Sequence, residues 1–224
     1  MSRAEILERI EGSGLAGSVK EYCAAIIRSA SGSSLKAALK ADAAKVVKNI
    51  DRLLAAGGEI FGCSKEEVLF ATGFNKNNRA PERFESALAE LSAAEFLHRE
   101  GFTSLKLIGA GPKKSADIFG IRDGRKYVFE VCCIQRHNEP AAASAAHLEA
   151  KYDEKLVQVN SSRKEYGCER GGIVFVTDPY NFAAFTDDMD LKKRAAELHA
   201  RKNKSRFVHM CLLSGGSAAV FPEW

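Results

Sequence analysis

The sequence lacks three features that would assign it to a class at once: a long apolar run, a CxxC pair of cysteines and a large excess of one charge. A transmembrane helix needs about 20 consecutive, mostly apolar residues, so we expect no membrane association. The six cysteines do not have zinc-site spacing, and the neighbouring Cys132 and Cys133 would point to opposite faces of a strand. The net charge of +4 permits a nucleic-acid partner without requiring one.

The first residues, MSRAEILERIEGSG, include acidic side chains and no apolar core, which is unlike a signal peptide. We therefore expect a cytoplasmic protein with reduced thiols. The chain has 224 residues, of which 46% are hydrophobic and 28% charged. These values are typical of a soluble globular protein with a sizeable core.

Residues 1–80 predict an all-helical region. Ser2 and Ser64 each begin a capping box with a glutamate three positions later, and Gly57-Gly58 is expected to end the helix that starts near residue 33. The turn-rich segment 73–81 marks a boundary. Residues 81–224 then predict a second domain with the order α-β-β-β-α-β-α-β, in which a mixed central sheet is covered by helices. The role of the helical region is left open between DNA recognition, formation of a homodimer and binding of a partner.

The segment SADIFGIRDGRKYVFEVCC predicts a β-hairpin, because Asp123-Gly124 is a strong signal for a two-residue turn. Counting outward from that turn places Asp117 directly opposite Glu130 on the same face of the sheet. Two carboxylates about 5 Å apart repel each other, and a bound Mg²⁺ or Mn²⁺ would remove that cost. A longer loop would instead separate the two residues and leave each one solvated.

The order of elements and the pair Asp117 and Glu130 resemble the PD-(D/E)XK nuclease superfamily, whose restriction-endonuclease-like core is α-β-β-β-α-β. The resemblance covers roughly residues 82–178. The family carries an Asp on the second core strand and Glu-x-Lys on the third, and its first core helix often adds a glutamate. Glu90 matches that glutamate best because its helical neighbours are apolar, whereas Glu85 and Glu95 have more polar surroundings.

The sequence departs from the family at the signature lysine, where Cys132 stands. A thiol cannot replace an ammonium group that orients water and offsets phosphate charge. Some family members carry this lysine on the next helix, and here Lys155 is the first choice and Lys151 the second. Gln158 on that helix and Gln135 after the third strand are further polar candidates.

The resemblance implies metal-assisted hydrolysis of phosphodiester bonds, most simply by an endonuclease acting on DNA. Asp117, Glu130 and the carbonyl of Val131 would hold Mg²⁺ or Mn²⁺, while Lys155 would stabilise the charged transition state. Lys113, Lys114 and Lys151, with Gln158 and Gln135, are the expected nucleic-acid contacts. Two alternatives stay open: an inactive nuclease-fold protein that binds nucleic acid or protein, which Cys132 favours, and an unrelated α/β interaction domain.

Overall fold

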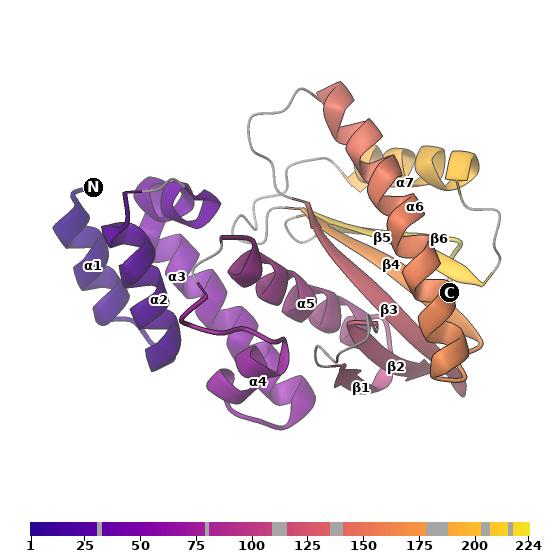
Figure 1. Ribbon diagram of the computed structural model, residues 1–224, viewed down its shortest axis with the longest axis horizontal. Helices are drawn as coiled ribbons and strands as arrows, with labels where there is room; N and C mark the ends of the chain where they lie inside the picture. The colour runs from indigo at the N-terminus through magenta and orange to yellow at the C-terminus, as the bar shows by residue number, and fades with distance from the viewer. Residues whose placement is uncertain are drawn as a thin grey trace.

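The computed structural model describes residues 1–30, 33–78, 81–108, 116–134, 141–177, 188–202, 207–214 and 217–224. It has an all-helical part at the N-terminus, and an α/β part follows in the chain and lies beside it (Figure 1). No helix among these residues is both long and apolar enough to span a bilayer. The six cysteines are all free thiols.

Four helices form the first part: α1 (Arg3–Glu11), α2 (Gly17–Arg28), α3 (Ser34–Phe61) and α4 (Lys65–Ala71). Both predicted capping boxes are present, at Ser2 with Glu5 and at Ser64 with Glu67. Each box satisfies backbone N–H groups that a helix start would otherwise leave without a partner. The buried faces of these helices share one apolar core with the start of the next helix, α5 (Pro81–Arg99).

The prediction that Gly57-Gly58 ends the third helix is wrong. Helix α3 continues to Phe61 and ends at Gly62, which takes the left-handed conformation with φ 67°. A Cβ at Gly57 would lie 3.2 Å from Leu91 and Val68, and one at Gly58 would lie 2.7 Å from the carbonyl oxygen of Cys63. The two glycines therefore allow close packing inside a helix rather than ending it.

The second part is a mixed sheet of six strands in the order β1-β2-β3-β4-β5-β6 among the described residues. Strands β1 to β3 are antiparallel, β3 to β5 are parallel, and β6 returns antiparallel to β5. The predicted element order is found, and β6 is an additional strand that was not predicted. The element bounds are β1 (Thr103–Leu107), β2 (Ile118–Arg122), β3 (Arg125–Ile134), α6 (Ala141–Glu165), β4 (Arg170–Thr177), α7 (Asp188–Lys202), β5 (Val208–Ser214) and β6 (Ser217–Phe221).

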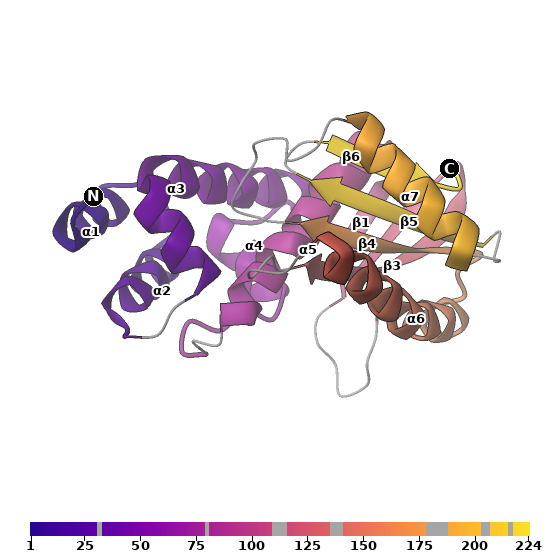
Figure 2. The ribbon, with the colours of Figure 1, turned by 90° about the horizontal axis from the view of Figure 1, so that it is seen from above.

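Helices cover the two faces of this sheet differently. Helix α5 packs on one face, against side chains such as Phe129 and Val131 of β3. Helices α6 and α7 pack on the other, against Cys132 and Ile134 of the same strand (Figure 2). The side chains of β3 therefore alternate between the two faces, as expected for Cys132 and Cys133, and Glu130 belongs by its position to the face that α6 covers.

The predicted hairpin register is confirmed. Arg122 pairs with Arg125, and Phe119 pairs with Val128. Both turn residues have positive φ, 50° at Asp123 and 74° at Gly124, as a tight two-residue turn requires. The alternative of a longer loop is thereby excluded, and this register fixes where Asp117 lies relative to β3.

Candidate active site

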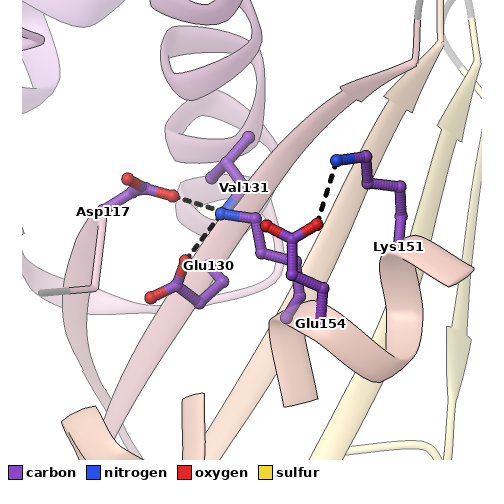
Figure 3. Close-up of polar contacts among 6 residues, drawn as sticks. Asp117, Glu130, Val131, Lys151 and Glu154 are labelled. Atoms are coloured by element: carbon purple, nitrogen blue, oxygen red, sulfur yellow. Dashed lines mark hydrogen bonds and ion pairs between the residues drawn. The ribbon is translucent and has the colours of Figure 1, made fainter. Parts of the chain in front are cut away.

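Asp117 lies one residue before β2, where regular pairing with β3 ends. Its backbone N–H donates to the carbonyl of Phe129 over 2.9 Å. In the regular register Phe129 pairs with Ile118, so this hydrogen bond departs from the ladder. Its side chain turns along β3, where a carboxylate oxygen accepts a 2.6 Å hydrogen bond from the backbone N–H of Val131 (Figure 3). The carboxylate of Asp117 thus lies beside Glu130. Asp117 reaches this place from the end of β2, and it is not the regular cross-strand partner of Glu130.

Glu130 is a buried carboxylate in the middle of β3, with only 2% of its surface exposed. Its Oε2 accepts a 2.8 Å hydrogen bond from Nζ of Lys155, a residue of α6. The side chain of Lys155 is itself only 18% exposed. An ion pair removed from water to this degree needs close geometry to offset its desolvation, and 2.8 Å meets that need.

Glu90, on α5, lies close enough to Asp117 and Glu130 for their charges to affect its pKa. Burial first, and then the negative charges of Asp117 and Glu130, raise the pKa of Glu90 to about 9, while Lys155 acts in the opposite direction. Helix α5 therefore contributes a third carboxyl group to the cluster. At neutral pH, without a metal, that group carries a proton.

The cluster of Asp117, Glu130, Glu90 and Lys155 has more acidic groups than one lysine can balance. Burial raises the pKa of Asp117, against the charge of Lys155 and the hydrogen bond from Val131. Burial alone would lower the pKa of Lys155, but the charges of Glu130 and Asp117 outweigh it and raise that pKa. A divalent cation would supply the missing positive charge, which is the chemistry this set of oxygen donors suits.

Replacing Glu90 with glutamine is expected to change how stability depends on pH. Because the folded-state pKa of Glu90 is raised to about 9, the folded protein holds a proton that the unfolded chain releases near the ordinary value. The contribution of Glu90 to the free energy of unfolding is therefore fully present below the unfolded-state pKa of this group. It is lost as the pH rises through the folded-state pKa. Between about pH 6 and about pH 8.5, the wild type should lose about 3 kcal/mol more than Glu90→Gln.

The measurement is urea unfolding with a chelator present, so that no metal masks the effect. Glu95→Gln is the matched control, because Glu95 lies on the same helix but pairs with Arg52 near the surface. Equal pH dependence in the wild type and Glu90→Gln would contradict this prediction.

Cys132 stands where the sequence resemblance would place a lysine, and it is 8% exposed and lies against α6. Burial raises the pKa of its thiol, and the positive charges of Lys155 and Lys151 oppose that rise. Lys155 therefore acts on the same stretch of β3 that a lysine at position 132 would occupy. Lys151 differs, because its Nζ lies 3.0 Å from Glu154 at the helix surface (Figure 3).

The remaining predicted site residues are Gln158, Lys113, Lys114 and Gln135. Gln158 is half-buried on α6, and Lys113, Lys114 and Gln135 lie outside the described residues. Glu85, one of the weaker candidates on α5, is 1% exposed and accepts a hydrogen bond from the hydroxyl of Ser34. Glu85 therefore ties α5 to α3 and does not belong to the cluster.

Only a few protein oxygen atoms of the cluster are placed to bind a metal ion, and they belong to Asp117 and Glu130. Within the described ranges, no three His, Cys, Asp or Glu side chains are gathered into a ready metal site. Mg²⁺ commonly binds through one or two carboxylates and keeps several waters for its remaining positions. Asp117 and Glu130 fit that mode, and the role of the Val131 carbonyl stays a prediction.

Comparison of the chain with protein-family models, curated proteins and solved structures finds no match.

Proposed function

We propose that the protein is a divalent-metal-dependent nuclease with a restriction-endonuclease-like domain, and that its substrate is DNA. The observation that carries this proposal is the contact between Glu130 and Lys155, 2.8 Å long and buried, beside Asp117. In this arrangement Lys155 supplies from α6 the ammonium group that Cys132 cannot supply from β3. The order α5-β1-β2-β3-α6-β4, with β3 parallel to β4, also agrees with the core of that fold.

Each residue of the cluster has a distinct role in this proposal. Asp117 and Glu130 would hold Mg²⁺ or Mn²⁺, which when bound polarises a phosphoryl group and lowers the pKa of a coordinated water. Lys155 stays charged because its carboxylate neighbours raise its pKa, so it can stabilise the negative charge that develops on the phosphate. Glu90 would release its proton when a cation replaces that proton as the balancing charge.

The proposal predicts DNA cleavage that depends on a divalent cation. Labelled single- and double-stranded DNA, with an RNA of the same sequence beside them, is incubated with Mg²⁺, Mn²⁺ or a chelator. Cleavage of DNA is expected with either ion and none with the chelator. In parallel, Mn²⁺ is expected to raise the melting temperature of the wild type, because it binds only the folded cluster.

Two results would contradict the proposal. Cleavage of RNA alone would show that the substrate is wrong. Binding of DNA with no cleavage under any ion, and with no Mn²⁺ shift in melting temperature, would support an inactive nuclease-fold binding protein. Cys132 at the lysine position is the observation that favours that second function.

A further inference from the structure

A half-exposed aromatic ring lies beside two arginines at the C-terminal end of α6. Phe207, directly before β5, keeps 53% of its surface exposed. The guanidinium carbons of Arg163, on α6, and Arg170, at the start of β4, both lie 5.3 Å from the centre of its ring. Two positive groups on one accessible ring form a surface for a ligand that is both planar and anionic.

Arg163 is held in place by contacts other than the ring. Its two terminal nitrogens donate to the side-chain oxygen of Asn160 over 3.2 Å and to the carbonyl of Glu169 over 2.7 Å. Its aliphatic stem lies against Gly171, where a Cβ would come within 2.9 Å of its Cδ. A side chain fixed in this way loses little further freedom when a ligand binds.

Two more basic residues stand at the start of β3, the strand that pairs with β4 at Arg170. Arg125 and Lys126, at the start of β3, are exposed, and Lys126 donates its backbone N–H to the carboxylate of Glu169. Burial and the neighbouring charge of Arg170 lower the pKa of Arg163. An anion placed against the two arginines would relieve their mutual repulsion.

We infer that Phe207, Arg163 and Arg170, which we call the Phe207 platform, bind a single-stranded segment of nucleic acid by base stacking and phosphate contact. Every base has a flat face that stacks on an aromatic ring, and arginine adds contact with the phosphate. The bases inside a duplex are already stacked on each other, so an exposed ring selects unpaired bases. The inference deepens the proposed function and rests on it for the identity of the ligand.

The spacing to the candidate active site suits a strand that passes both. Arg163 lies eight residues after Lys155 on the same helix, a separation of ~12 Å at ~1.5 Å per residue. Stacked nucleotides advance about 3.4 Å each along one strand. About three or four nucleotides therefore separate a phosphate at Lys155 from a base on Phe207.

The test is the binding of a fluorescent 15-nucleotide oligothymidylate, followed by anisotropy in the presence of a chelator so that no cleavage occurs. Phe207→Leu keeps an apolar side chain and removes the aromatic face, and it is expected to weaken binding about tenfold. Phe207→Trp is expected to bind at least as well as the wild type. Phe70→Leu is the matched control, because Phe70 is also half-exposed but lies on α4 and stacks on Phe74.

The outcomes separate this inference from the proposed function. Equal binding by Phe207→Leu and the wild type would overturn the platform, as would an equal loss in Phe70→Leu or an absence of oligothymidylate binding by the wild type. Binding that depends on Phe207, in a protein that cuts no DNA with Mg²⁺ or Mn²⁺, would support the platform and overturn the nuclease. Melting temperatures of the variants show whether each one is folded.

Discussion

Glu130→Gln is expected to reduce Mg²⁺-dependent DNA cleavage by about 1000-fold or more, and Glu130→Ala to abolish it. Removal of groups that only support a metal ligand already costs about 10- to 100-fold, and Glu130 is proposed as a ligand itself. The glutamine side chain has nearly the same shape, and its amide oxygen can still accept the hydrogen bond from Lys155. The loss would therefore report the missing charge at the metal rather than a disordered β3.

The matched control is Glu85→Gln, a substitution of the same type at another buried glutamate of the second part. Glu85 bonds to Ser34 on the helical side of α5 and lies outside the cluster, so its variant is expected to cut DNA like the wild type. Cleavage rates over a range of Mg²⁺ concentrations, with melting temperatures recorded in parallel, provide the measurement. Cleavage by Glu130→Gln at the wild-type rate would remove Glu130 from the site.

The hairpin was predictable because local chemistry determines it. Asp123 and Gly124 both take positive φ, a conformation that few residue pairs adopt readily. Once the turn is known, the alternation of β3 places Glu130 and Cys132 on one face. The helical spacing of α6 then makes Lys155 a candidate, and the structure brings its Nζ to Glu130.

Features that depend on contacts between distant segments were not predictable in the same way. Gly57 and Gly58 have the composition of a helix end, but the close approach of Leu91, Val68 and Cys63 gives them their role. Strand β6 is too short and rich in small residues to give a clear pattern, and it forms against β5. Such packing is a tertiary effect that overrides local propensity.

The side-chain contacts of the candidate site were predicted only in part. The sequence places Asp117 near Glu130, but not the hydrogen bond from Val131 that turns its carboxylate along β3. Nor does the sequence show that Arg122, beside the hairpin turn, lies over the rings of Phe102 and Trp224. Phe207 had no sequence signal beyond being aromatic beside basic residues, because its arginine neighbours come from α6 and β4.

Exchanging the positions of lysine and cysteine between α6 and β3 is the sharpest test of the proposed role of Lys155. Lys155→Ala is expected to lower cleavage about 100- to 1000-fold, because one preorganised charge on the developing phosphate is lost. Adding Cys132→Lys to Lys155→Ala returns an ammonium group to the same stretch of β3, where the alanine also leaves space on the α6 face. The double variant is therefore expected to cut DNA at least about tenfold faster than Lys155→Ala alone.

The exchange also separates Lys155 from Lys151 and from a purely structural effect. Lys151 pairs with Glu154 at the surface, so Lys151→Ala should cost far less than Lys155→Ala. Lys65→Ala breaks a lysine–aspartate pair of similar length, 2.7 Å, in the helical part; that pair is more exposed, so the variant controls for loss of an ion pair near the surface. Leaving Glu130 buried without Lys155 is destabilising by about 3–5 kcal/mol, and unfolding measurements quantify that part. Recovery of cleavage without a matching recovery of stability would show that the ammonium group acts on the substrate, whereas cleavage that follows stability in both variants would assign Lys155 to folding.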